Sequence, residues 1–244
     1  MIKFFRQIRQ SLIMKNQTGK YFKYAIGEII LVVIGILIAL QVNNWNEHRK
    51  LKRTQSNYLE QLSADIDSMQ FHYKGIVGYR EIKLNEARES FKILQSCKIT
   101  KDDKNIFDEA LLSYNDLGVL FEIRDTYDEM LSANLVASIE NKNFKNIITE
   151  FYGQRDAMQV FIEQFKENLN SDYLAIKEHV VFGFNEVNQP TVEYKIEDLC
   201  NKPDFTNALV NLVRTRENAY RMVVILSQKL ERMQGMLSAE NDKF

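Results

Sequence analysis

The chain has 244 residues, of which 45% are hydrophobic and 27% are charged, and its formal net charge is −1. Near-neutral charge, with no dense lysine and arginine patch outside the flanks of one apolar segment, argues against a nucleic-acid partner. Two prolines and nine glycines are few for this length, so the composition favours long helices.

Residues 1–23 are basic and contain no acidic residue. Phe5, Ile8 and Leu12 recur at helical spacing, and the lysines and arginines fall on other faces. This pattern favours an interfacial helix that lies on an anionic leaflet. The alternative is a basic tail that only sets the membrane topology.

Residues 24–42 are apolar on every side and predict a transmembrane helix. A helix of this length spans about 28 Å, close to the ~30 Å hydrocarbon core of a bilayer. The segment starts too far from the N-terminus for a cleaved signal peptide and ends without an A-x-A-like site. An uncleaved signal anchor is therefore expected.

The charges that flank this segment predict its orientation. Six lysines and arginines precede it, whereas four lie just beyond it in residues 49–53. The positive-inside rule then places the N-terminus in the cytoplasm and the C-terminal part on the other side of the membrane.

Three residues of the membrane segment are candidates for transmembrane contacts. Glu28 either contacts a partner helix or exchanges protons, or it lies in the first turn near the interface, where a carboxylate costs less. Its position favours the interfacial alternative. Gly35 and Ala39 form a small-xxx-small pair that would let a second span approach. Such pairs also arise by chance, so dimerisation stays open.

Residues 43–57 are polar without an apolar stripe and predict a helical stalk, and residues 58–240 predict one extramembrane helical domain. In residues 59–96 the apolar positions alternate in steps of three and four, which is typical of a helix packed along one stripe. Gly75 and Gly78 weaken this register. One continuous helix is favoured over two because its length would match the later helices.

The middle of the chain predicts two short helices. Asp102 or Asp103 is expected to cap the first, after a polar turn. The segment Thr126–Glu129 fits a capping box that opens the second at Thr126. Residues 132–134 are expected to loosen this helix.

Two long helices follow, at about 144–180 and 204–240, each with a clean apolar seam. A loop is expected between them, in which residues 191–196 could make a short strand without a partner. The seams step near 3.5 residues, so we expect an all-α bundle of three long, nearly parallel helices plus short distal helices. In this arrangement helix 59–96 runs away from the bilayer, helix 144–180 returns, and helix 204–240 runs out again.

Each of the two later seams contains one charged residue, Arg155 in the first and Arg216 in the second. A buried arginine needs acceptors. Either both guanidinium groups face an anion- or partner-binding cleft, or each makes a structural ion pair or reaches the edge of the bundle. The structural alternative is favoured.

Cys97 and Cys200 are the only cysteines. Two unpaired, partly buried thiols are expected, because a single sequence does not show the distance between them. A disulfide is the alternative if this part of the chain lies outside the cytoplasm.

No catalytic motif occurs in the sequence. The three histidines lie far apart, and no H-E-x-x-H, C-x-x-C, G-x-S-x-G or Walker pattern is present. We therefore expect no catalytic, metal-binding or cofactor-binding residues.

The membrane segment and several later motifs resemble a known family. The matching parts are residues 1–6, residues 23–47, Tyr58-Leu59 with Leu62, Thr126-Tyr127-Asp128-Glu129-Met130-Leu131-Ser132-Ala133-Asn134, and Ile139-Glu140-Asn141-Lys142. The chain is similar to the single-pass membrane proteins of unknown function that are numerous in flavobacteria and other Bacteroidota.

The resemblance implies an anchor in the inner membrane of a Gram-negative cell, with a cytoplasmic N-terminus and a helical periplasmic domain. It brings no activity. It also places Glu28 and the pair Gly27 and Gly35 in a recurrent motif. Where the family has a Ser-Gly turn, this chain has Ser132-Ala133.

The function expected from these observations is a membrane-anchored helical interaction module, which contacts the lipid bilayer and a protein partner or a second copy of itself. A ligand-sensing periplasmic domain is the alternative, with Arg155 and Arg216 in the ligand site. It would work through a partner, because only about twenty residues lie on the cytoplasmic side. An enzyme is the third and least favoured alternative.

Overall fold

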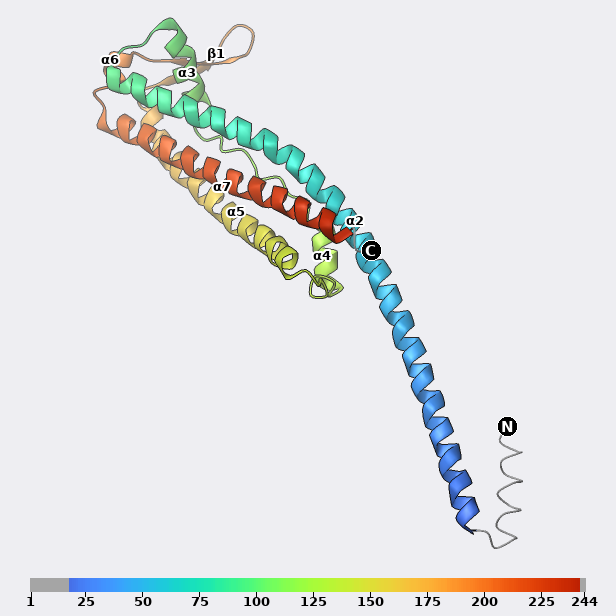
Figure 1. The fold of residues 1–244 in the computed structure, drawn as a ribbon. Helices are drawn as coiled ribbons and strands as arrows, with labels where there is room; N and C mark the ends of the chain where they lie inside the picture. Colours follow the sequence, from blue (N-terminus) through green and yellow to red (C-terminus); the bar gives the residue numbers. More distant parts are fainter. Residues whose placement is uncertain (1–17, 242–244) are drawn as a thin grey trace. The chain divides into compact units, whose positions relative to one another are not determined.

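A computed structural model describes residues 18–241 (Figure 1). The interfacial helix expected around Phe5, Ile8 and Leu12 lies outside the described residues. The elements in chain order are α2 (Thr18–Ser96), α3 (Lys101–Leu112), α4 (Asp125–Ser132), α5 (Lys142–Lys177), β1 (Val181–Phe184), β2 (Pro190–Glu193), α6 (Ile196–Leu199) and α7 (Pro203–Asn241). The expected all-α class is confirmed.

Helix α2 belongs to both of the compact units into which the chain divides, residues 1–57 and 58–244. From Ala25 it is long and apolar enough to cross a membrane, and no part of its most apolar stretch is buried inside the protein. The helix is continuous through Gly75 and Gly78. The preference for one helix over residues 59–96 is therefore confirmed.

The second unit is a bundle of three long helices: α5, α7 and the part of α2 beyond Tyr58. Helix α7 is antiparallel to α2, because Gln70 Nε2 donates to Leu230 O (3.0 Å) whereas Arg80 Nη1 donates to Ala219 O (2.7 Å). Helix α7 is antiparallel to α5 as well. Asn211 Nδ2 of α7 donates to Asp172 Oδ2 of α5 at one end, and Lys229 Nζ of α7 donates to Glu150 Oε2 of α5 at the other.

These contacts make α5 parallel to α2 and α7 antiparallel to both, so the expected directions of the two later helices are wrong. The reason lies in residues 113–124, which return from the Ser96 end of the bundle to the Tyr58 end in a mostly non-helical conformation. An extended chain advances about 3.3 Å per residue against 1.5 Å in a helix, so a short segment completes the return. Apolar seams carry no information on direction.

Specific contacts hold this return segment against the helices. The hydroxyl of Tyr114 donates to Ala208 O (2.8 Å) on α7, and the ring of Phe121 lies 3.9 Å from the ring of His72 on α2. The hydroxyl of Tyr152 on α5 donates to Ile123 O (3.0 Å). All three long helices therefore contact the segment.

The apolar seams form the core of the bundle, as their spacing predicts. On α2 most of the seam from Leu59 to Leu94 is buried, with Ile76 and Phe91 partly buried, and the seams of α5 and α7 are buried over most of their length. The largest fully buried side chains include Tyr73, Tyr114, Tyr152, Phe107, Phe144, Phe151 and Phe205.

The starts of the two short helices differ from the expected caps. Thr100, rather than Asp102 or Asp103, is the N-cap of α3, and it forms a reciprocal capping box with Asp103 at the third helical position. Helix α4 begins at Asp125 with Arg124 as its N-cap and no side-chain cap. Thr126 is thus not a cap, because the helix starts one residue earlier and encloses it.

Helix α4 ends where the sequence predicts, and Asn134 makes the turn. Asn134 adopts a left-handed conformation (φ 57°). The N–H of Leu135 donates to Met130 O (2.8 Å) and the N–H of Asn134 donates to Leu131 O (3.0 Å). This is a Schellman ending, in which asparagine tolerates the conformation that glycine usually provides.

The loop between α5 and α7 contains a β-hairpin, which corrects the expectation of a strand without a partner. β1 pairs with β2 in antiparallel register, from Val181 opposite Glu193 to Phe184 opposite Pro190. The segment around β1 is short and apolar, so its spacing does not separate a strand from the end of a helix. Tyr194, just after β2, donates its hydroxyl to Asp108 of α3 (2.8 Å) and so holds the hairpin to the bundle.

Cys97 and Cys200 form a disulfide, with their Cα atoms 5.5 Å apart across 103 residues of sequence. The expectation of two unpaired thiols is therefore wrong. The bond connects the end of α2 to the residues just before α7, two points that the sequence alone does not bring together.

Replacing Cys200 by alanine should lower the free energy of unfolding by about 2–4 kcal/mol, because the bond closes a long loop in the unfolded chain. Urea unfolding of the full-length protein in detergent, followed by circular dichroism, measures the change. The double variant Cys97→Ala/Cys200→Ala should match the single variant. Rapid maleimide labelling of the non-reduced wild-type protein would contradict the disulfide.

Candidate functional site

The candidate transmembrane residues lie on the apolar part of α2. Glu28 is partly exposed, whereas Gly35 and Ala39 are exposed. No atom lies within 4 Å of the position that a Cβ would take at Gly35. The small pair therefore leaves an open face on the helix, and its use by a second span stays a prediction.

Arg155 connects α5 to the return segment. Its Nη1 atom lies 3.1 Å from Glu122 Oε2, and its Nη2 atom donates to Leu120 O (3.3 Å). The side chain is only 16% exposed. This geometry is that of a structural ion pair.

Arg216 connects α7 to the other elements from inside the bundle, where it is 2% exposed. Its Nη1 atom donates to Lys83 O (2.6 Å), and its Nη2 atom donates to Ser113 O (2.7 Å) and Ser113 Oγ (3.0 Å). Burial lowers the pKa of this guanidinium group, although the charge of Glu86 opposes the shift. Arg216 therefore joins α7 to α2 and to the end of α3.

A second buried arginine, Arg80, makes the reciprocal contact from α2 to Ala219 O on α7. It is 3% exposed, and burial lowers its pKa. Arg80 is not among the residues predicted from the sequence, although it occupies the seam position between Ile76 and Leu84. Continuing the three-and-four spacing across the two glycines would have found it.

Arg155 and Arg216 bind different acceptors, on the return segment in one case and on α2 and α3 in the other. The structure therefore does not bring them to one point. Their contacts support the structural alternative, and an anion- or partner-binding role for either stays an untested prediction.

Beside Arg216, Asp116 fixes the start of the return segment to α2. Its carboxylate accepts from the hydroxyl of Tyr79 and from the N–H of Gly118 (2.8 Å), which has a left-handed conformation (φ 66°). Burial raises the pKa of Asp116, but these hydrogen bonds and the charge of Arg216 outweigh it and lower the pKa overall. Burial, with the hydrogen bond to Asp116, raises the pKa of Tyr79 to about 12. Tyr79 is thus the donor at neutral pH.

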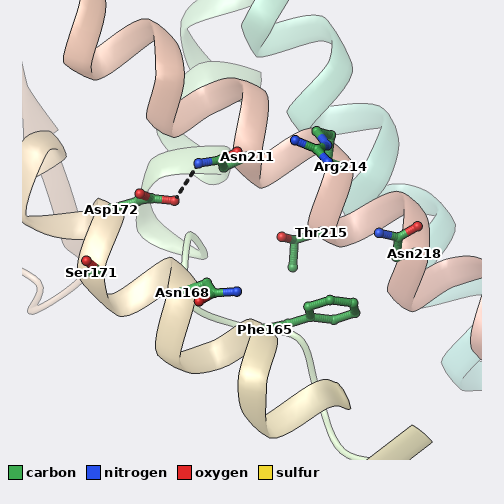
Figure 2. Close-up of a pocket in the computed structure, with 8 residues that line it drawn as sticks. All are labelled: Phe165, Asn168, Ser171, Asp172, Asn211, Arg214, Thr215 and Asn218. Atoms are coloured by element: carbon green, nitrogen blue, oxygen red, sulfur yellow. Dashed lines mark hydrogen bonds between the residues drawn. The ribbon is translucent and has the colours of Figure 1, made fainter.

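A polar groove of about 310 Å³ lies between α5 and α7 (Figure 2). We call it the α5–α7 groove. Most of the side chains that line it carry amide, hydroxyl or charged groups. They are Phe165, Asn168, Ser171 and Asp172 from α5, and Asn211, Arg214, Thr215 and Asn218 from α7.

The groove is a polar stretch along the mainly apolar contact between α5 and α7. The residues from α7 lie at i, i+3, i+4 and i+7 from Asn211, so they share one side of that helix. Asn211 Nδ2 donates to Asp172 Oδ2 (3.0 Å) across the groove. The sequence analysis did not single out this region, because each of its residues also fits a solvated helix face.

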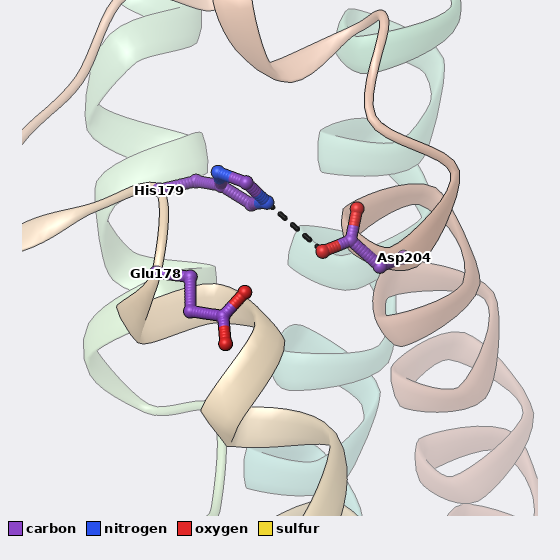
Figure 3. Close-up of side chains that lie close together, drawn as sticks. All are labelled: Glu178, His179 and Asp204. Atoms are coloured by element: carbon purple, nitrogen blue, oxygen red, sulfur yellow. Dashed lines mark hydrogen bonds and ion pairs between the residues drawn. The ribbon is translucent and has the colours of Figure 1, made fainter.

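A histidine and two carboxylates, His179, Glu178 and Asp204, lie together near the start of α7 (Figure 3). Their potential ligand atoms are all within 4.8 Å of one another, so the set offers the groups that a divalent cation needs. His179 Nε2 lies 2.9 Å from Asp204 Oδ2, and this hydrogen bond lowers the pKa of Asp204. The hydrogen bond and the helix start account for the cluster without an ion.

The sequence analysis found no metal-ligand neighbour for His179 because it compared residues at helical spacing. Asp204 is 25 residues away along the chain and comes close only because the hairpin returns the chain. Glu178 and Asp204 are residue types that are common at exposed helix ends, so the sequence does not distinguish them from ordinary surface carboxylates.

The chain belongs to the family of unknown function DUF6090, whose model matches residues 28–217. The match begins within the apolar part of α2 and extends into α7. No curated protein and no solved structure matches the chain. Membership of a family without an assigned activity, as the resemblance implies, is therefore confirmed.

Replacing Arg216 by glutamine should lower the free energy of unfolding by about 2–4 kcal/mol, because the carbonyls of Lys83 and Ser113 lose a charged donor inside the bundle. Thermal and urea unfolding measure the loss. The exposed Arg232 on the same helix provides the control, and Arg232→Gln should change stability by less than about 0.5 kcal/mol. Equal stability of the two variants would show that Arg216 does not connect the helices.

Proposed function

We propose that this protein is a membrane-anchored helical interaction module of the bacterial envelope, acting as a scaffold, adaptor or accessory subunit. One observation carries the proposal: the apolar part of α2 is not buried by any described part of the chain. Water is an unfavourable surrounding for a helix of this composition, so lipid or another span must cover it. A helical bundle without a catalytic motif is then held at the membrane surface.

The disulfide between Cys97 and Cys200 supports a location of the bundle outside the cytoplasm, because disulfides persist in oxidising compartments. The excess of lysine and arginine before the span supports the same orientation. Together they favour an inner-membrane anchor with the N-terminus in the cytoplasm and the bundle in the periplasm.

The β-hairpin is the surface that we propose for binding a protein partner. Val181, Phe184 and Val187 are 66%, 71% and 72% exposed within a segment of seven residues. Single exposed apolar residues are ordinary on protein surfaces, but a group of them on a projecting hairpin favours contact with another protein. We propose that the partner is a second envelope protein or another copy of this chain.

A ligand-sensing role that works through such a partner is a second candidate. The α5–α7 groove favours it, because several of its polar side chains face one cavity without bonding to one another. An enzymatic role has no such support, since the sequence contains no nucleophile or metal motif.

A photo-crosslinking residue at Phe184, and another at Val33 in the span, should capture the same envelope protein in intact cells. Crosslinked products identified by mass spectrometry provide the measurement. Glu167, an exposed charged residue on α5, is the control position, and a crosslinking residue placed there should give little product.

With the photo-crosslinking residue at the exposed Val187 instead, a Phe184→Asp variant should lose the product from the hairpin but keep the protein in the membrane, whereas Glu186→Lys should retain the product. Capture of the protein itself would indicate a homo-oligomer. Products that are absent, or that do not differ between the tested and control positions, would contradict the interaction role.

A further inference from the structure

The α5–α7 groove contains two opposite charges, Asp172 and Arg214, that make no ion pair with any described residue. Asp172 accepts a hydrogen bond from Asn211 but makes no ion pair, and Arg214 makes neither a hydrogen bond nor an ion pair within the described residues. Some other charges on the same two helices are paired, as between Lys229 and Glu150 (2.7 Å), whereas Arg214 is exposed to solvent. The groove therefore offers one cationic and one anionic group at the same place.

The two charged side chains come from the two different helices that form the groove. Asn211 contacts Asp172 directly, and Arg214 follows it on α7 by three residues, or about 4.5 Å along the helix axis. Figure 2 shows Asn211 between the two charged side chains in that view. The groove therefore presents an anionic group from α5 and a cationic group from α7 to a single ligand.

The remaining lining residues provide hydrogen bonds and one apolar contact. Asn168, Asn218 and Thr215 make no side-chain hydrogen bond to any described residue, and Thr215 is nevertheless only 8% exposed. Their amides and hydroxyl can each donate and accept. The ring of Phe165 lies in the same groove and is the only aromatic group among the lining residues.

We propose that the α5–α7 groove binds a free α-amino acid with an apolar side chain. Arg214 binds the α-carboxylate, Asp172 binds the α-ammonium group, and the apolar side chain lies against Phe165. The volume of about 310 Å³ is at the lower end of the range for ligand pockets and suits a ligand of this size. This inference is independent of the proposed interaction role, since it concerns the groove and not the hairpin.

Two other ligand chemistries use only part of the groove. A neutral sugar would bind the amides and hydroxyls but would leave both charges without a partner. A simple carboxylate would bind Arg214 and would leave Asp172 unpaired, close to a like charge. Only a zwitterion satisfies both charged side chains.

Isothermal titration of the full-length protein in detergent tests the proposal with L-leucine, L-methionine and L-phenylalanine as probes. At least one should bind saturably. For leucine, two analogues remove one charge each: leucinamide lacks the carboxylate, and 4-methylpentanoate lacks the amine. Each should bind at least about tenfold more weakly than the amino acid, because each loses a charged hydrogen-bonding group.

Arg214→Gln and Asp172→Asn should each weaken binding of the same amino acid by at least about tenfold. Arg232→Gln and Glu167→Gln are the matched controls, since both residues are exposed on the same two helices outside the groove, and neither should change the affinity. Circular dichroism establishes that each variant is folded.

Three results would overturn the proposal: no saturable binding of any of the three amino acids, equal affinity for leucine and its two analogues, or equal affinity of the groove variants and their controls. Saturable binding of glucose without binding of an amino acid would also overturn it. A failure here would leave the crosslinking result at Phe184 unaffected, because the hairpin is a separate surface.

Discussion

The lack of hydrogen-bond partners inside a lipid bilayer is the constraint on which the rest of this account depends. A backbone N–H or C=O without a partner costs several kcal/mol in hydrocarbon, so a single isolated segment can cross only as a helix. The apolar part of α2 meets this requirement, because every backbone group there is bonded within the helix while its side chains stay uncovered by the protein. The proposed tether follows from that combination.

Within the bundle, contacts between side chains and backbone carbonyls determine how the helices are connected. Arg80 donates from α2 to α7, and Arg216 donates from α7 back to α2. Both guanidinium groups are buried without an ion pair in the described residues. Their hydrogen bonds to carbonyl oxygens, together with the charges of nearby carboxylates such as Asp116, offset part of the cost of burial. The return segment adds a further connection, since Arg155 and Tyr152 hold it to α5. A small set of polar contacts thus specifies an arrangement that apolar seams alone would leave open.

The sequence predicted the long helices well, because buried apolar residues at steps of three and four identify a helix face directly, as from Leu59 to Leu94. It did not predict helix direction, since the seams of α5 and α7 are the same in either direction. It gave the disulfide only as the less favoured alternative and missed the cluster around His179. The reason is common to both, because each joins residues that are far apart in sequence. The α5–α7 groove was missed because Asp172 and Arg214 are ordinary surface residues until two helices bring them to the lining of one groove.

The central claim is that α2 crosses the membrane and that the bundle lies on the side opposite the N-terminus. The most direct measurement adds protease to intact spheroplasts of cells that express the chain with different epitope tags at its two ends. The account predicts that the C-terminal tag is lost while the N-terminal tag is protected until the inner membrane is lysed. Protection of the C-terminal tag in intact spheroplasts, or recovery of the whole chain in the soluble fraction without detergent, would contradict it.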